Sequence, residues 1–326
     1  MDVLRTQAVR VHEPGDPGAL VVEDVEVPPP GHGEARITHD AVGLNFIDTY
    51  HRSGLYPIQL PATIGSEGAG RVEATGPGVT GLTVGDRVAY PNSLGAYCGA
   101  RLIAADRLVV LPEGIETELA AASMLKGLTA WYLLHRTHSV REGETVLVHA
   151  AAGGIGSLLV PWARALGARV IGTVGSEAKA ERARELGCDV LIRYREEDVV
   201  EGVMEATAGR GVDVVYDGVG RSTFEASLAS VAEFGLLVAF GNASGPVGPV
   251  DLLSLRDRSA YVTRPSLGPH IRTAASLRAG AAALFDALAD GTLAVEIGQR
   301  FRLEEAAAAH EALESRSTIG STILLP

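Results

Sequence analysis

The chain has 326 residues, of which 46% are hydrophobic and 21% are charged, and this composition is typical of a globular protein of about two domains. Its net charge is −12 and it has no basic run, which disfavours a surface that binds nucleic-acid phosphates. The N-terminus lacks the apolar core of a signal peptide, and no apolar run approaches the ~20 residues that span a bilayer. We therefore expect a cytoplasmic protein without a membrane partner.

Residues 1 to about 120 carry short alternating segments separated by turns rich in glycine and proline. The segments that predict strands are Gln7–His12, Ala19–Val27, Glu34–Val42, Gly70–Ala74, Arg87–Tyr90 and Leu108–Val110. Short strands with this much glycine between them favour a compact, barrel-like β domain over a doubly wound sheet.

The pattern changes after Pro112. Glu118–Leu134 is long and poor in β-branched residues, which predicts a helix. Predicted strands and helices then alternate, in the order Thr145–His149, Ser157–Leu166, Arg169–Val174, Glu177–Leu186, Val190–Ile192, Val199–Ala206, Val212–Tyr216, Thr223–Val231 and Leu236–Phe240. This alternation predicts a parallel sheet with helices on both faces.

The turn Ala150–Gly156 joins the first strand of this sheet to its helix. Its spacing, Ala151-x-Gly153-x-x-Gly156, is the dinucleotide fingerprint with alanine in the first glycine position. A strand, a glycine turn and a helix present free N–H groups and a helix N-terminus to a phosphate. Since the turn lies at the first crossover, we predict that it binds the pyrophosphate of a dinucleotide.

The end of the second strand indicates which dinucleotide binds. An acidic residue that accepts the ribose hydroxyls of NAD is expected about 20 residues after the glycines. Gly175 and Ser176 stand there instead, and Lys179 follows one turn into the helix. We interpret Glu177 as a solvent-facing residue that favours the helix dipole. Lys179 is one of only two lysines, so we favour a contact with a 2′-phosphate over a solvated lysine, and predict NADPH.

Two polar residues stand at strand ends of the same region. His149 ends the first strand, and we expect a packed histidine rather than a proton donor. Asp217 ends the fourth, and we expect a structural carboxylate that bonds the following loop.

Regularity fades after Gly241. The later segments predict a strand at Tyr261–Arg264, helices at Arg278–Gly291 and Leu303–Ser315, and a closing strand at Ser321–Leu325. We expect the closing strand to return to the β-rich domain, which is then discontinuous in sequence.

Nine stretches together resemble one family. They are GLNFIDTYHRSGLYP (43–57), KGLTAWYLL (126–134), HAAAGGIG (149–156), GTVG (172–175), YREED (194–198), VVYDGVGR (214–221), FGNASG (240–245), YVTRPSL (261–267) and HEALESRSTIGSTILLP (310–326). The chain resembles the zinc-independent quinone oxidoreductases, the zeta-crystallin-like branch of the medium-chain dehydrogenase/reductase superfamily. The resemblance implies an α/β fold, with a GroES-like β-rich catalytic domain at 1–122 and 266–326 and a Rossmann NADPH-binding domain at 123–265. It also implies a homodimer through Rossmann edge strands, for which Tyr261–Thr263 is the candidate.

The resemblance implies roles for individual residues. Asn45, Tyr50 and Tyr56 border the nicotinamide and the acceptor, and Tyr50 hydrogen-bonds the acceptor oxygen while Tyr56 stacks on a planar ring. Arg264 bonds or steers the acceptor. The alternatives are packing tyrosines and a surface arginine. The implied cofactor-binding residues are Asn45, Tyr50, Thr129, Gly153, Gly154, Ile155, Gly175, Ser176, Lys179, Tyr194, Val219, Gly241, Asn242, Leu267 and Arg316.

Metal-dependent relatives hold zinc with three residues. The resemblance places Asn45 and Ser66 at the first two of these positions and Lys126 near the third. Amide and hydroxyl oxygens are poor zinc ligands beside thiolate and imidazole, and an ammonium group repels the ion. Glu67 alone does not hold zinc, and the two cysteines lie far apart in sequence. We therefore predict no metal.

Without a Lewis acid, alcohol oxidation loses its means of stabilising an alkoxide. Hydride reduction of a conjugated carbonyl remains feasible, because the charge then falls on an oxygen that protein donors can stabilise. We predict an NADPH:quinone oxidoreductase, with a quinone or an enone as the small-molecule acceptor. An enone or enal reductase on the same scaffold is the first alternative. A cofactor-binding protein with an RNA-binding or structural, crystallin-like role is the second, which the net negative charge and the pocket tyrosines disfavour.

Overall fold

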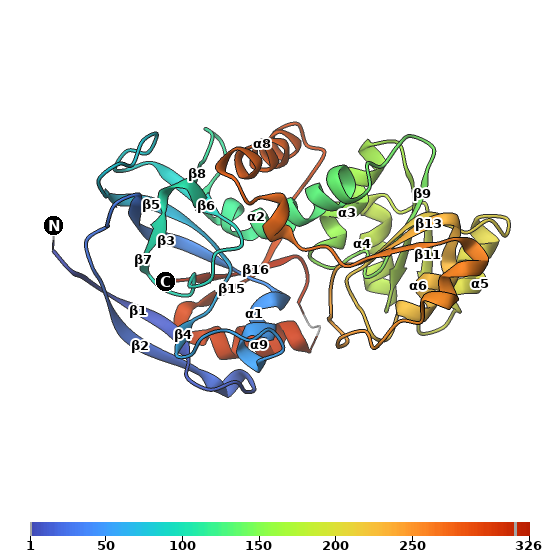
Figure 1. The fold of residues 1–326 in the computed structure, drawn as a ribbon, viewed down its shortest axis with the longest axis horizontal. Coiled ribbons are helices and arrows are strands. Elements are labelled where there is room, and N and C mark those ends of the chain that lie inside the picture. Colours follow the sequence, from blue (N-terminus) through green and yellow to red (C-terminus); the bar gives the residue numbers. More distant parts are fainter. Residues whose placement is uncertain (1, 316–317) are drawn as a thin grey trace. The chain divides into compact units, whose positions relative to one another are not determined.

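The computed structural model describes residues 2–315 and 318–326. The chain forms two compact units, which Figure 1 shows as a ribbon. We call the first the β-rich unit, comprising Met1–Leu128, Ile271–Ala289 and Val295–Pro326, and the second the Rossmann unit, comprising Thr129–His270 and Asp290–Ala294. The predicted domain limits of 1–122 with 266–326, and of 123–265, stay a prediction.

The β-rich unit contains two sheets. One has the strand order β2-β1-β4, and the other has the order β15-β16-β3-β5-β6-β8, with β7 also paired to β3. The strands are β1 (Leu4–Val11), β2 (Leu20–Val27), β3 (Glu34–Leu44), β4 (Ala62–Thr63), β5 (Glu67–Thr75), β6 (Arg87–Tyr90), β7 (Ala100–Ala104), β8 (Val109–Val110), β15 (Ile297–Arg302) and β16 (Ser321–Leu325). Thr322 of the closing strand pairs with Leu44, so β16 does return to the N-terminal strands, as the sequence predicts.

Successive side chains of a strand point to opposite faces of its sheet, and the inward-facing side chains of these strands form one apolar core. Ile37, Leu44, Tyr90 and Tyr97 are fully buried in it. Among the described residues, four α-helices have residues in this unit: α1 (Phe46–Ser53), α2 (Thr117–Tyr132), α8 (Ala274–Ala289) and α9 (Ala306–Glu314). The sequence analysis did not predict α1, β4, β7 or β15. These elements are either very short or, like β15, alternate without a strongly apolar face.

The Rossmann unit is built on a six-stranded sheet of order β11-β10-β9-β12-β13-β14, in which every pair is parallel. Its strands are β9 (Thr145–Val148), β10 (Arg169–Val174), β11 (Val190–Arg193), β12 (Val212–Asp217), β13 (Val231–Ala239) and β14 (Tyr261–Thr263). Its helices include α3 (Gly156–Ala165), α4 (Glu177–Leu186), α5 (Val199–Ala206), α6 (Phe224–Ser230) and α7 (Leu267–His270). The predicted alternation of strands and helices is confirmed, except that β13 begins five residues earlier than expected.

Parallel pairing places the carboxyl ends of the strands at one edge of this sheet. Val148 of β9 pairs with Gly172 of β10 on one side and with Tyr216 of β12 on the other. The loops that follow these three strands therefore lie side by side, at the edge where such sheets bind ligands. Among the described residues, no helix has both the length and the apolar character needed to cross a membrane.

Candidate functional site

The turn after β9 has the backbone geometry that close approach of a phosphate requires. Ala150 has a positive φ of 52°, and the N–H of Gly153 donates to the carbonyl of Ala150 at 2.8 Å. A Cβ atom at Gly156 would lie 2.4 Å from the carbonyl oxygen of Ala150, so only glycine fits where α3 begins. Gly154 and Ile155, which the resemblance places at the pyrophosphate, lie in the same turn and precede a ten-residue helix.

Four residues expected around the adenosine come together after β10. Ser176 is the N-cap of α4, and Lys179 lies in the first turn of that helix. The Tyr194 side chain packs against Gly175, because a Cβ atom at Gly175 would lie 2.4 Å from the Tyr194 Oη atom. A larger side chain at Gly175 would displace this tyrosine, so the small strand end and Tyr194 form one local structure.

Glu177, at the start of α4, faces solvent as predicted, with its side chain 53% exposed. Its carboxylate pairs with Arg184 at 3.0 Å and with Arg193 at 3.2 Å. Arg193 also pairs with Glu196 at 3.1 Å and with Glu197 at 3.3 Å, so Glu177 belongs to an exposed network of ion pairs at this strand end.

Two further loops meet at the same edge. Asp217, the last residue of β12, is fully buried and accepts hydrogen bonds from the N–H groups of Val219 at 2.8 Å and Gly220 at 3.0 Å. The expected loop-bonding role of this carboxylate is therefore confirmed. A Cβ atom at Gly241 would lie 2.2 Å from the carbonyl oxygen of Gly218, so the loop after β13 touches the loop after β12. Asn242 is the next residue of the loop after β13.

The remaining residues that are predicted to bind the cofactor or the acceptor are more scattered. Thr129 lies in the last turn of α2 and is buried, and Leu267 begins α7 and is buried. Arg264 follows β14 and is exposed, and its guanidinium donates to the Pro265 carbonyl at 3.2 Å. Arg316 lies outside the described residues. The roles of all four stay predictions.

In the β-rich unit, α1 brings the predicted acceptor residues together. Asn45 is the N-cap of this helix, and Tyr50 lies on it. The rings of Tyr50 and Tyr56 are 5.2 Å apart at 66°, and the Tyr56 N–H donates to the Tyr50 carbonyl at 3.0 Å. Phe46 and His51 add further ring contacts, at 6.5 Å from Tyr50 and 6.3 Å from Tyr56. The result is an aromatic cluster beside a polar helix N-terminus.

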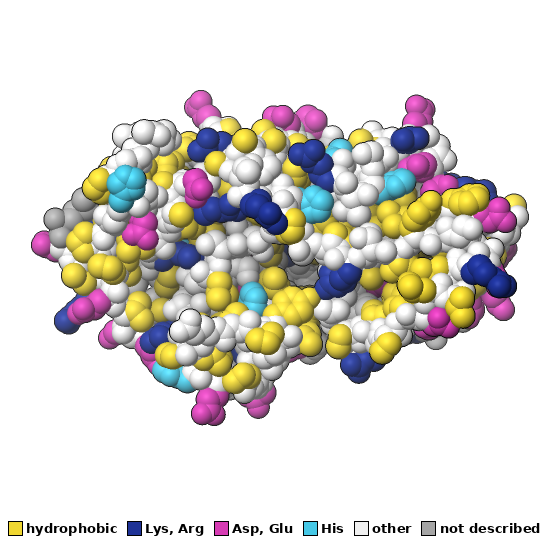
Figure 2. All heavy atoms as spheres, in the orientation of Figure 1, with side chains coloured by type: hydrophobic (Ala, Val, Ile, Leu, Met, Phe, Trp, Pro, Cys, Tyr) yellow, Lys and Arg dark blue, Asp and Glu magenta, His cyan; other side chains and the backbone are white. Residues whose placement is uncertain are grey.

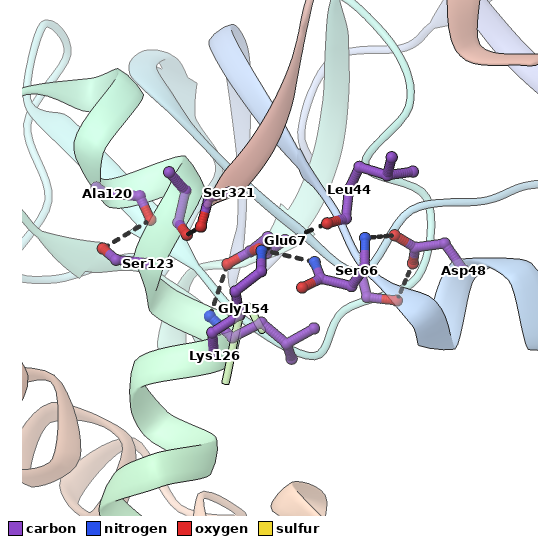
Figure 3. A network of polar contacts seen from close by, with 12 residues as sticks. Leu44, Asp48, Ser66, Glu67, Ala120, Ser123, Lys126, Gly154 and Ser321 are labelled. Carbon is purple, nitrogen blue, oxygen red and sulfur yellow. Dashed lines mark hydrogen bonds and ion pairs between the residues drawn. The ribbon is translucent and has the colours of Figure 1, made fainter. Parts of the chain in front are cut away.

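Glu67, the first residue of β5, is fully buried at the centre of a polar cluster (Figure 3). Its carboxylate accepts hydrogen bonds from Asn45 Nδ2 at 2.7 Å and from the Leu125 N–H at 2.6 Å. The ammonium of Lys126 lies 3.5 Å from the same carboxylate and donates to the Leu44 carbonyl at 3.4 Å. Burial raises the pKa of Glu67, and Lys126 and Asn45 oppose that rise. Glu67 thus orients the Asn45 amide and holds a lysine that is only 8% exposed.

A second buried carboxylate lies beside the first. Asp48 accepts hydrogen bonds from the Asn45 N–H at 2.9 Å, the Ser66 hydroxyl at 2.7 Å and the Tyr97 hydroxyl at 3.2 Å. Burial raises the pKa of Asp48 to about 7, although these donors lower it. The sequence analysis missed Asp48, although the three-residue spacing from Asn45 is the spacing of a helix capping box.

The three positions compared with zinc ligands, Asn45, Ser66 and Lys126, therefore lie around two carboxylates. The set offers an amide, a hydroxyl and an ammonium, and the ammonium already provides a positive charge beside Glu67. Within residues 2–315 and 318–326, no group of three or more His, Cys, Asp or Glu side chains is arranged to hold a metal ion.

Comparison with known proteins agrees with both units. Residues 31–141 match the family model of the alcohol dehydrogenase GroES-like domain, and residues 154–286 match that of the zinc-binding dehydrogenases. These matches confirm the predicted fold class.

Full-length relatives are also similar. The chain is 53% identical to a quinone oxidoreductase of Pseudomonas aeruginosa, over 96% of this chain and 97% of the relative. It is 46% identical to a 2-haloacrylate reductase of a Burkholderia species, with 98% of each covered. The crystal structure of Escherichia coli quinone oxidoreductase complexed with NADPH superposes with a TM-score of 0.96 at 46% identity, covering 98% of this chain and 100% of that one.

Proposed function

This chain belongs to the quinone oxidoreductase family of the medium-chain dehydrogenase/reductase superfamily, and we propose that it reduces quinones by hydride transfer from NADPH without a metal ion. The observation that carries the proposal is the polar cluster around Glu67. There, Lys126 and Asn45 occupy positions that the resemblance equates with zinc ligands.

NADPH fits the loops of the Rossmann unit. Gly153, Gly154 and Ile155 offer a glycine turn and a helix N-terminus for the pyrophosphate. Gly175 and Ser176 place no carboxylate at the strand end, and we propose that Lys179, in the first turn of α4, and Tyr194, which packs on Gly175, hold the 2′-phosphate. Arg316 is the second cation of this proposal. The E. coli relative, whose structure contains NADPH, supports this choice of cofactor.

When it is bound, NADPH supplies the hydride, and the residues of the chain orient the acceptor and stabilise the charge that it gains. Tyr50 donates a hydrogen bond to the acceptor oxygen, and Tyr56 provides an aromatic face for a planar ring. Asn45 caps the same helix and its amide is fixed by Glu67, which suits a residue that bonds the nicotinamide side. Arg264 is proposed to steer or bond the acceptor.

The donor set of this cluster disfavours a metal ion in the reaction. An ion bonded to Asn45 and Ser66 would lie close to the buried ammonium of Lys126, whose charge would repel it. The acceptor must then be electrophilic enough to take hydride without a Lewis acid, and quinones meet this requirement.

A second candidate function is the reduction of an activated alkene. The similar 2-haloacrylate reductase favours it, because its substrate is an activated alkene rather than a quinone. The exposed Arg264 would suit an anionic acceptor of that kind. An RNA-binding role is disfavoured by the net charge of −12, and basic side chains are dispersed among acidic and apolar ones on the face shown in Figure 2.

We also propose a homodimer through the Rossmann sheet. Within the described chain, β14 is the last strand of that sheet, so one side of it is available for pairing. Tyr261 on β14 is 59% exposed, and Phe234 on the neighbouring β13 is 68% exposed. Light scattering on the protein and on Tyr261→Lys tests this, since the variant is expected to be monomeric.

The experiment that tests the function is an NADPH-oxidation screen of the purified protein against quinones, enals, enones and haloacrylates. We expect the highest kcat/KM with a quinone. A preference for an alkene acid by more than about tenfold, or about 1.4 kcal/mol in transition-state binding, would replace the first candidate with the second.

A further inference from the structure

Five polar groups at the carboxyl edge of the Rossmann sheet form one continuous chain of hydrogen bonds. The Ala150 N–H lies 3.3 Å from Thr173 Oγ1, which lies 3.0 Å from His149 Nδ1. His149 Nε2 lies 2.9 Å from Ser227 Oγ, which lies 2.7 Å from the Asp217 carboxylate. All four side chains are buried, so a break in this chain cannot be repaired by water at the surface.

The proton positions follow from the donors available. Ser227 gives its one hydroxyl proton to the Asp217 carboxylate, so its oxygen accepts the Nε2–H of His149. His149 Nδ1 is then unprotonated and accepts the hydroxyl proton of Thr173, whose oxygen accepts the Ala150 N–H. Burial lowers the pKa of His149, which agrees with a neutral ring carrying one N–H. Every bond of the chain therefore runs in one direction, from the backbone of Ala150 to Asp217.

The two ends of this chain of hydrogen bonds lie in different loops. Ala150 opens the glycine turn that is proposed to bind the pyrophosphate. At the other end, Asp217 accepts the N–H groups of Val219 and Gly220 and the hydroxyl of Thr223. The resemblance implies that Val219 binds the cofactor, and we place it on the nicotinamide side. The side chains of His149 and Ser227 thus join the turn that is proposed to bind the pyrophosphate to the loop that lies on the nicotinamide side.

We propose that Thr173, His149, Ser227 and Asp217 are positioning residues that fix the glycine turn and the Val219 loop relative to each other, so that the pyrophosphate and the nicotinamide of NADPH are bound at once. The inference rests on the proposed function, because it requires NADPH at these loops. Breaking one buried link leaves a donor or an acceptor unpaired and loosens the Val219 loop. Binding of the nicotinamide half of the cofactor is then weakened more than binding of the adenosine half.

The test compares two serine substitutions on the same short helix. Ser227→Ala removes the link between His149 and Asp217. Ser230→Ala is the matched control, because Ser230 is equally buried on α6 and its hydroxyl donates to the Ala226 carbonyl of its own helix, at 2.7 Å. Both variants lose one buried hydroxyl, so a general loss of stability affects both.

Each protein is titrated with NADPH and with 2′,5′-ADP, which carries the adenosine and the 2′-phosphate but no nicotinamide. We expect Ser227→Ala to raise the Kd for NADPH on the order of tenfold, because NADPH binding must then order the loosened Val219 loop, at a cost comparable to one buried hydrogen bond. The Kd for 2′,5′-ADP should change by less than about twofold, as should both constants in Ser230→Ala. An unchanged NADPH affinity in Ser227→Ala, or equal weakening of both ligands, would overturn the inference. A wild-type protein that does not bind NADPH would instead refute the proposed function.

A second pair of variants covers the case in which Ser227→Ala does not fold. Thr173→Val keeps the side-chain shape without the hydroxyl, and Thr173→Ser keeps the hydroxyl. We expect Thr173→Val to weaken NADPH on the order of tenfold and Thr173→Ser to retain its affinity within about twofold. Equal effects of the two variants on NADPH binding would show that the hydroxyl, and hence the chain of bonds, has no positioning role.

Discussion

Replacing Lys126 with methionine removes the ammonium beside Glu67 while keeping a side chain of similar length. Glu67 is fully buried, and it would keep only the hydrogen bonds from Asn45 at 2.7 Å and Leu125 at 2.6 Å. Breaking a buried ion pair by removing one partner costs about 3–5 kcal/mol. Because two hydrogen bonds to Glu67 remain, we expect a loss of stability at the lower end of this range, about 3 kcal/mol. For a unit of this size that corresponds to a fall in Tm of roughly 6–12 °C.

The loss should depend on pH in a defined direction. Burial already raises the pKa of Glu67 above its ordinary value of 4.5, and removal of Lys126 raises it further. Below pH 4.5 Glu67 is protonated in the folded and the unfolded states of both proteins, so Lys126→Met should differ little from the wild type. As the pH passes the pKa of Glu67 in the folded wild type, Glu67 ionises beside Lys126 but stays protonated in the variant, and the deficit grows until the still higher pKa of the variant is passed.

Thermal unfolding followed by circular dichroism at pH 4 and at pH 7.5 measures this deficit. The matched control is Lys126→Met combined with Glu67→Gln, in which no buried charge is left unpaired, so most of the Tm should be recovered at pH 7.5. An equal loss at both pH values, or no recovery in the double variant, would refute a charged pair at this position.

Three other predictions concern separate parts of the site. Lys179→Met should raise the Kd for NADPH about tenfold and leave that for NADH unchanged, because only NADPH carries the 2′-phosphate; equal shifts in calorimetry would contradict this. Tyr50→Phe should lower quinone turnover at least about tenfold with little change in NADPH affinity, as expected for a donor to the acceptor oxygen, and unchanged turnover would remove Tyr50 from the mechanism. Burial raises the pKa of Asp48 in the folded state from its ordinary value of 3.8 to about 7, so this burial costs stability increasingly as the pH rises between these values. Asp48→Asn should flatten that slope in unfolding experiments, and an unaltered slope would mean that Asp48 does not titrate there.

The Rossmann unit was predictable because its information is local. Its central strands, such as Thr145–Val148, are buried along their whole length, and each reads as an apolar run that a turn and a helix follow. The glycine turn and the neutral strand end at Gly175 and Ser176 were accordingly found from spacing alone.

The polar cluster of the β-rich unit was not predictable in the same way. Glu67 meets Asn45 because β3 and β5 pair with Gly43 opposite Glu67, and it meets Lys126 through a helix almost sixty residues further on. No local pattern encodes such pairings. Asp48 and α1 are an intermediate case, because the capping-box spacing from Asn45 to Asp48 was present in the sequence.

The most direct test of metal-free, NADPH-dependent quinone reduction joins elemental analysis to turnover on one sample. The purified protein is dialysed against a strong chelator, its zinc content is measured, and NADPH oxidation with a quinone is followed. We predict full activity with zinc far below one ion per chain. Activity that disappears with the zinc and returns when zinc is restored would contradict the account.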